Sequence, residues 1–251
     1  MKKVRLLNGR FDHVTLEQSI DAIDRDTAAG VRGWAVTINV SILMMMRSDP
    51  ELASFMHRAR WTLADGQPLV WLSRALEREL PERVTGVDLI DPLCERAIAT
   101  GRKIYFLGAT PDVIETLEAR IRRDHPALEC AFDDGYFSNV EAVDRAQAIA
   151  DFGTDWLIVG MGVPRQEHFI EHHWDQFNVS MAVGVGGSFD VLAGLRKRAP
   201  LWMQRVGLEW LFRLLQEPRR LFLRYLVTNT QFMVLAARAL FRRARARARK
   251  D

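Results

Sequence analysis

Short apolar runs alternate with amphipathic stretches over most of the chain. Four runs are rich in β-branched or aromatic residues and most lead into glycine, which predicts buried strands over 34–40, 103–107, 156–160 and 179–185. Helical patterns lie between them, and prolines tolerated in a first helical turn mark their starts: Pro50, Pro68, Pro111 and Pro164. Another helix is predicted over 88–100, ended by Gly101. This alternation predicts an α/β fold, with a mostly parallel, Rossmann-like sheet covered by helices on both faces.

The pattern changes from Pro200 onward to apolar residues at helical spacing. One apolar face runs over 208–215, Pro218 interrupts it, and a second face resumes over 221–226. Arginines alternate with alanine near the end, over 242–249, and would spread around a helix, so we expect a mobile basic arm there. We therefore divide the chain into an α/β domain over 1–195 and a basic helical appendage over 196–251.

Charge is distributed unevenly between these two parts. Of the 251 residues, 48% are hydrophobic and 27% charged, which is typical of a globular protein. The net charge of +3 combines 15 Lys and Arg against 3 Asp and Glu over 196–251, a net of +12, with 20 against 29 over 1–195, a net of −9. An acidic body with a basic end indicates that the end meets an anionic partner: lipid headgroups, nucleic acid or a phosphorylated substrate.

Cysteine content and hydropathy exclude several classes of protein. Cys94 and Cys130 are far apart and outside any CxxC spacing, which argues against a zinc site or a disulfide framework and fits a reducing compartment. The N-terminus has no apolar run typical of a signal peptide. The longest apolar stretch, 225–241, contains polar residues and falls short of the ~20 residues needed to cross a bilayer. We expect no spanning helix.

Polar side chains follow two of the apolar runs. Thr37 and Asn39 lie at the carboxyl end of the first predicted strand, the edge where open α/β sheets bind ligands, although Asn39 could simply cap the next helix. Asp65 precedes Gly66 and the helix-opening Pro68, and is either an N-cap or a general base. The adjacent helix start would stabilise its ionised form and weaken it as a base.

Three further segments offer sites for anions. Arg83 lies in a loop, where it is either solvated or paired with phosphate, and Asp88 is placed to cap the helix that follows. Glycine-rich turns follow two strands, one at Gly108 and one at 184–190. Neither is a Walker loop nor the GxGxxG dinucleotide fingerprint, so both signals are weak.

Metal binding is not favoured by the histidines and adjacent acids. His168 and His172 are spaced i, i+4, but no HExxH motif accompanies them, and surface histidines on a helix are the simpler interpretation. Asp133 and Asp134 precede Gly-Tyr and are interpreted as a turn. We predict neither a metal nor a cofactor.

Nine stretches, in chain order, span nearly all of the chain after its first thirty residues: TINVSIL (37–43), ADGQPLVW (64–71), RVTGVDL (83–89), YFLGATP (105–111), DDGYF (133–137), VGMGVPRQEHFI (159–170), GVGGSFDVLAG (184–194), RAPLWMQRVGLEWLFRL (198–214) and EPRR (217–220). Together they resemble the WecG/TagA/CpsF family of bacterial glycosyltransferases, the N-acetylmannosaminyltransferase type. The last four stretches are long and unusual, so the resemblance is specific.

The resemblance implies an inverting, metal-independent transfer from a UDP-sugar to a saccharide on a polyprenyl diphosphate carrier. It implies that Asp65 is the base for the acceptor hydroxyl. Further residues would contact the substrates: Thr37, Asn39, Arg83, Gly108, Tyr136, Gln166, Gly186, Gly187 and Asp190. The appendage would close over the site at the membrane and bring three arginines to the diphosphate: Arg213, Arg220 and Arg224.

Two features bear on substrate and location. Teichoic-acid-type members tend to carry an acidic residue soon after the asparagine, whereas Ser41 follows Val40 here, which places the chain nearer the exopolysaccharide branch. The donor sugar stays open between N-acetylmannosamine, its uronic acid and glucose, and a homo-oligomer is one option. A basic amphipathic end fits a cytoplasmic enzyme held on the inner face of the cell membrane, since each Lys or Arg near an anionic surface contributes roughly 1 kcal/mol.

Two other classes of protein compete with this interpretation. A nucleotide-binding oxidoreductase on the same kind of sheet would carry a cofactor fingerprint in the first strand-to-helix turn, which is missing. A nucleic-acid-binding protein would use the arginine-rich tail, but would leave the polar loops between 37 and 190 without a purpose.

Overall fold

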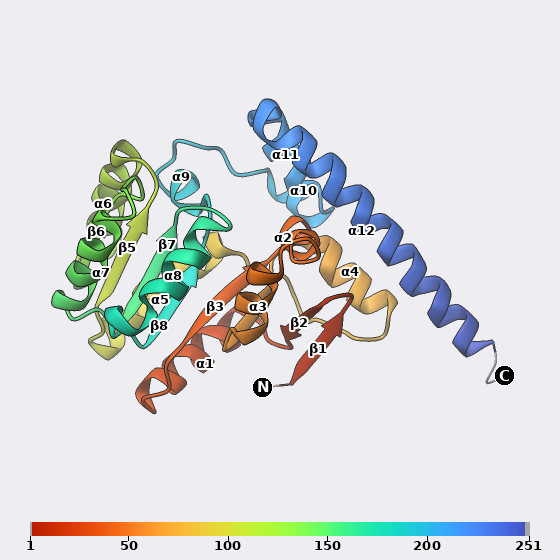
Figure 1. Cartoon of the computed structure of the whole chain (residues 1–251), viewed down its shortest axis with the longest axis horizontal. Helices are drawn as coiled ribbons and strands as arrows, with labels where there is room; N and C mark the ends of the chain where they lie inside the picture. Colours follow the sequence, from red (N-terminus) through yellow and green to blue (C-terminus); the bar gives the residue numbers. More distant parts are fainter. Residues whose placement is uncertain (1, 249–251) are drawn as a thin grey trace.

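The computed structural model describes residues 2–248, and its centre is one six-stranded sheet (Figure 1). The strands are β3 (Gly33–Ile38), β4 (Trp61–Ala64), β5 (Ile104–Gly108), β6 (Cys130–Asp133), β7 (Trp156–Gly160) and β8 (Met181–Gly184). Their order across the sheet is β4-β3-β8-β7-β5-β6, and every neighbouring pair is parallel. The prediction of a parallel α/β sheet is confirmed.

Helices cover both faces of the sheet, also as predicted. One core is formed with α2 (Val40–Met45), α3 (Pro50–Arg58), α4 (Gln67–Ala75), α7 (Glu141–Asp151) and α8 (Arg165–Phe177). The other core is formed with α1 (Leu16–Ala28), α5 (Gly86–Thr100), α6 (Pro111–Asp124) and α9 (Ser188–Leu192). Alternate residues of β7 point to opposite faces, so that Leu157 and Val159 join the first core and Trp156 and Ile158 the second.

Element boundaries differ from the predicted ones where a polar residue caps a helix. The first predicted strand was extended to Val40, but β3 ends at Ile38 because the Asn39 side chain accepts a hydrogen bond from the Ile42 amide (3.0 Å) and starts α2. Pro50, Pro68 and Pro111 lie in first helical turns as predicted, whereas Pro164 immediately precedes α8. Gly101 ends α5 in a left-handed conformation, as expected.

A hairpin that the hydrophobic pattern did not predict covers one edge of the sheet. It consists of β1 (Lys3–Leu6) and β2 (Gly9–Asp12), paired antiparallel. The buried Asp12 carboxylate accepts hydrogen bonds from the Thr62 amide (2.7 Å) and from Lys3 Nζ (2.7 Å). These bonds attach the hairpin to β4, where an edge strand would otherwise expose its backbone.

Three helices follow the sheet: α10 (Leu201–Arg205), α11 (Glu209–Gln216) and α12 (Pro218–Arg247). Figure 1 shows α12 as one long helix that passes α2 and α4 and continues beyond the sheet. Phe232 and Ala236 of α12 are buried in the core that includes α2. The proposed domain boundary at 195 falls in the loop between α9 and α10.

The predicted mobile arm is wrong for the residues that the structure describes. The helix α12 continues through Arg247, because alanine and arginine are both strong helix formers and because Arg243 has a fixed partner. Arg243 donates to the Ala75 carbonyl (2.8 Å) at the end of α4 and pairs with Glu77. Residues 249–251 lie outside the described part. Within 2–248, no helix has both the length and the hydropathy to cross a bilayer.

Candidate active site

One cavity of about 690 Å³ opens at the carboxyl ends of the parallel strands. Its floor comes from residues that follow β3, β4, β7 and β8, and its roof comes from α11 and α12. It brings together twelve of the predicted site residues: Thr37, Asn39, Asp65, Arg83, Tyr136, Gln166, Gly186, Gly187, Asp190, Arg213, Arg220 and Arg224. Because this edge is where open α/β sheets bind ligands, the cavity is the candidate active site.

Gly108 is the one predicted site residue that does not line the cavity. It has φ +146, and a Cβ at this position would lie 2.5 Å from the Gly160 carbonyl carbon. Its role is therefore to let β5 and β7 approach closely. Ala109 and Thr110, which follow it, do reach the cavity.

Asp65 lies at the end of β4 with its carboxyl group in the cavity. It does not cap α4, whose N-cap is Gly66. Protein surrounds the carboxyl on most sides, and this burial raises its pKa from 3.8 to about 6; the charge of Arg213 is the strongest opposing effect. A helix start was expected to lower this pKa, but the pKa is raised instead, because desolvation of the carboxyl is the largest effect. A carboxyl with a pKa near 6 is suited to proton transfer at neutral pH.

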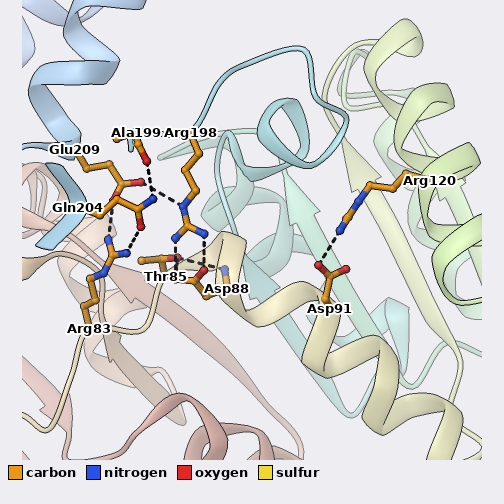
Figure 2. A network of polar contacts seen from close by, with 9 residues as sticks. All are labelled: Arg83, Thr85, Asp88, Asp91, Arg120, Arg198, Ala199, Gln204 and Glu209. Carbon is orange, nitrogen blue, oxygen red and sulfur yellow. Dashed lines mark hydrogen bonds and ion pairs between the residues drawn. The ribbon is translucent and has the colours of Figure 1, made fainter. Parts of the chain in front are cut away.

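Arg83 joins the body of the protein to the appendage (Figure 2). Its guanidinium donates to the Glu209 carboxylate (2.7 Å) of α11 and to the Gln204 side chain of α10. A parallel connection runs from Arg198, which binds both oxygens of Asp88 (2.6 and 2.8 Å). These ion pairs hold α10 and α11 over the sheet edge.

Asp88 does not cap α5, contrary to the prediction. The cap is Thr85, whose hydroxyl accepts from the Asp88 amide (3.2 Å) and donates to the Asp88 carboxylate (2.8 Å). Burial raises the pKa of Asp88, but the hydrogen bonds from Arg198 and Thr85 outweigh it and hold the pKa below its usual value. Asp88 is thus an ionised anchor for the appendage.

Gln166 connects the two glycine-containing loops on the cavity floor. Its side-chain oxygen accepts from the amides of Gly162 (3.2 Å) and Gly186 (3.0 Å), and its nitrogen donates to Glu167 (2.8 Å). Space for this side chain requires glycine at 184, where a Cβ would lie 2.4 Å from the Gln166 nitrogen. Gln166 therefore holds these two loops together at the floor of the cavity.

The three predicted arginines of the appendage differ in their partners. Arg220 pairs with Glu217 (2.6 Å), and its side chain is 65% exposed. Arg224 donates to the Ser41 hydroxyl (2.8 Å), and burial lowers its pKa. Within the described residues, Arg213 has no hydrogen-bond or ion-pair partner for its side chain. Arg213 is thus a cation in the cavity whose charge is available to a ligand.

The remaining predicted residues line the other end of the cavity. Tyr136 is 68% exposed, with the Arg165 guanidinium over its ring (5.8 Å to the centroid). Asp190 pairs with Arg196 (3.3 Å) beside the Gly186–Gly187 turn. An aromatic ring, a carboxylate and exposed backbone amides form a surface that can bind a base, a ribose and phosphate.

The turn interpretation fits Asp134, whereas Asp133 is the last residue of β6. Asp134 accepts a hydrogen bond from the Tyr136 amide (2.7 Å), and both aspartates pair with Arg145. His172 is exposed and its Nδ1 lies 2.7 Å from the His168 carbonyl oxygen. Over residues 2–248 no three His, Cys, Asp or Glu side chains are grouped so that they could hold a metal ion.

Comparison with known proteins decides the family. Residues 4–246 match the description "Glycosyl transferase WecG/TagA/CpsF family". The chain belongs to this family. It is 31% identical over 221 residues to the N-acetylglucosaminyldiphosphoundecaprenol N-acetyl-beta-D-mannosaminyltransferase of Staphylococcus aureus strain MW2, covering 87% of each chain. The proteins of the same name in strains NCTC 8325 / PS 47 and COL match equally. The sequence resemblance is thereby confirmed, and the oxidoreductase and nucleic-acid alternatives are set aside.

Three residues of this glycosyltransferase were missed by sequence reasoning. Glu167 is buried behind Gln166, and burial raises its pKa to about 7. Trp210 and Tyr225 of the appendage line the cavity. Trp210 and Glu167 lie within stretches that carry the family resemblance. Glu167 directly follows Gln166, and Trp210 lies three residues before Arg213, so these positions were a usable signal. Tyr225 was interpreted only as part of an apolar helix face.

Proposed function

We propose that this glycosyltransferase transfers a sugar from a UDP-sugar to a polyprenyl-diphosphate-linked saccharide, with inversion at the anomeric carbon and without a metal ion. The printed name of the Staphylococcus aureus relatives supports an acceptor that carries N-acetylglucosamine on a diphosphate and a polyprenol. The observation that carries the proposal is the Asp65 carboxyl, with its raised pKa, in the same cavity as Arg213. The product fits cell-surface polysaccharide or exopolysaccharide synthesis.

Asp65 acts as the general base in a single displacement. Its carboxylate takes the proton of an acceptor hydroxyl as the oxygen bonds to the anomeric carbon of the donor sugar. The bond from that carbon to the UDP oxygen breaks on the opposite face, and its electron pair leaves with UDP. Attack opposite the leaving group inverts the anomeric configuration.

The leaving diphosphate is stabilised by protein groups in this proposal. The backbone amide of the exposed Gly187 offers a donor from the body, and Arg213 and Arg224 offer cations from the appendage. Fixed donors and cations aimed at developing charge are among the largest contributions to catalysis. Thr37, Asn39 and Gln166 complete the donor site, and Asp190 and Tyr136 bind the nucleoside end. Arg220 is a further cation for the diphosphate, and Arg83 holds the roof in position.

A product assay tests the function directly. Radiolabelled UDP-N-acetylmannosamine, UDP-N-acetylmannosaminuronic acid and UDP-glucose are each incubated with a synthetic short-chain lipid diphosphate that carries N-acetylglucosamine, in the presence of EDTA. We expect one donor to give a labelled lipid-linked disaccharide, with the anomeric configuration inverted in its NMR spectrum. Transfer that stops on addition of EDTA would contradict the metal-independent mechanism, and retained configuration would contradict the single displacement.

We further propose that the appendage rests on an anionic membrane, at the inner face of the cell membrane. Four apolar side chains at the start of α12 are more than half exposed: Phe222, Leu223, Leu226 and Val227. Exposed arginines flank them on the same helix at Arg219, Arg238 and Arg242. An apolar strip bordered by cations is the arrangement by which a helix lies in a lipid interface.

Replacing Leu223 and Leu226 together by serine is expected to weaken binding to anionic vesicles roughly tenfold or more, because two partly inserted apolar side chains are lost. Cosedimentation with phosphatidylglycerol vesicles measures this. The matched control replaces Val140 and Val143 together by serine. These valines lie at the start of α7 and are 80% and 50% exposed, and their replacement should leave binding unchanged. If both double variants bind the vesicles equally well, the apolar strip of α12 does not contribute to membrane binding.

A further inference from the structure

Two aromatic side chains of the appendage form a pair at the cavity. Trp210 of α11 and Tyr225 of α12 have ring centroids 6.0 Å apart and planes at 82°, an edge-to-face arrangement. Both rings line the cavity, and both are only partly buried. Edge-to-face contact leaves ring faces that the partner ring does not cover.

The Tyr225 ring lies beside the proposed catalytic base. Burial raises the pKa of its phenol, and the charges that act on it are those of Arg213, Arg224 and Asp65. The structure records no hydrogen bond from the Tyr225 hydroxyl to any residue of 2–248. The phenol therefore offers a hydroxyl in the cavity that is free to bind a ligand.

The aromatic pair and the proposed nucleoside surface belong to different parts of the chain. The nucleoside surface of Tyr136 and Asp190 belongs to the loops of the body, whereas Trp210 and Tyr225 belong to the appendage. The exposed apolar strip of Phe222, Leu223 and Leu226 surrounds Tyr225 in sequence on the same helix. The pair thus shares the cavity with Asp65 and belongs to the part of the chain that carries the exposed apolar strip.

We propose that Trp210 and Tyr225 form the platform on which the sugar ring of the lipid-linked acceptor binds. This inference rests on the proposed function. An aromatic face packs against the apolar C–H face of a pyranose, and the Tyr225 hydroxyl can bind one of the sugar's polar groups. Stacking would fix the ring plane and so direct one acceptor hydroxyl toward the Asp65 carboxylate.

Steady-state kinetics with a water-soluble, short-chain acceptor test the platform without a contribution from the membrane. Tyr225→Ala is expected to raise the acceptor KM roughly tenfold, with the KM for the UDP-sugar unchanged. Tyr225→Phe, which keeps the ring, should retain most of the acceptor affinity. Trp210→Ala should reproduce the effect of Tyr225→Ala, and Trp210→Phe should restore part of it.

Phe241→Ala is the matched control, because Phe241 is a 69% exposed aromatic on the same helix outside the cavity. It should change neither KM. A rise in donor KM with an unaltered acceptor KM in Tyr225→Ala would overturn the inference, and so would equal effects of Tyr225→Ala and Phe241→Ala.

Calorimetric titration of the acceptor analogue into the UDP-bound protein separates this inference from the proposed function. If the wild type binds the analogue and Tyr225→Ala binds it roughly tenfold more weakly, the platform is supported even if the transfer assay gives no product. No product with any donor, by contrast, would contradict the proposed function. Unchanged affinity in both Tyr225→Ala and Trp210→Ala would overturn the platform regardless of turnover.

Discussion

Asp65→Asn is expected to lower kcat roughly 100- to 10,000-fold, with the fold and the UDP-sugar affinity retained. Asparagine has nearly the shape of aspartate but cannot take a proton from the acceptor hydroxyl. The carboxyl lies in the cavity at the end of β4, and within the described residues its side chain has no hydrogen-bond partner that the substitution would break. Initial rates at saturating donor and acceptor measure the effect.

The matched control for this substitution is Asp91→Asn. Asp91 is an aspartate of α5 that pairs with Arg120 (2.8 Å) outside the cavity, as Figure 2 shows. Its replacement should leave kcat unchanged. Near-normal turnover by Asp65→Asn would remove Asp65 from the mechanism, and an equal loss in Asp91→Asn would mean that the assay reports altered folding.

The raised pKa of Asp65 adds a pH dependence with a defined sign. A base must be ionised, so kcat/KM of the wild type should fall about tenfold per pH unit below pH 6, where Asp65 becomes protonated.

Folding favours the protonated carboxyl, and the stability that it contributes is present below pH 3.8 and lost as the pH rises through about 6. Asp65→Asn should therefore raise Tm relative to the wild type at pH 7.5 more than at pH 4.5. A lower Tm at pH 7.5 would mean that Asp65 is a structural group.

The central strands of the sheet could be predicted from sequence, and its two edges could not. All four predicted strands lie inside the sheet, where an apolar run must be buried on both faces. The two missed strands, β4 and β6, are the edge strands and contain only four residues each. Strand β8 also has four residues, but it lies in a longer apolar run over 179–185, whereas the runs at β4 and β6 are not extended in this way. The pairing of such short edge runs is decided by neighbours such as the β1–β2 hairpin.

The candidate site was predictable wherever a side chain follows directly from a strand end. Thr37 needed only the rule that parallel strands present their carboxyl ends at one edge. Asp65 follows a strand that was not predicted, and Gln166 lies in α8, so these two depended on the family resemblance. The contacts of Arg83 needed more, because its partner Glu209 is 126 residues away along the chain. Local pattern does not encode which distant acid a loop arginine meets, so the contact by which Arg83 holds the roof could not be predicted.

Arg213→Ala is expected to lower kcat/KM roughly 100- to 1,000-fold, the usual effect of removing one group that stabilises developing negative charge. Among the appendage arginines, Arg198 is paired with Asp88 of the body, and Arg220 is paired with Glu217. Arg213 lines the cavity without such a partner in the described chain, and its charge acts on Asp65. It is therefore the cation best placed to meet the diphosphate.

Loss of Arg213 should also move the pKa of the base. Since the Arg213 charge is the strongest influence that lowers the Asp65 pKa, its removal should shift the acid limb of the kcat/KM profile to higher pH. Arg205→Ala, which removes an exposed arginine of α10 outside the cavity, is the control and should change neither the rate nor the profile. A slow variant with an unshifted acid limb would mean that Arg213 acts away from Asp65. An unshifted limb together with a normal rate would show that neither the diphosphate nor the base depends on this cation.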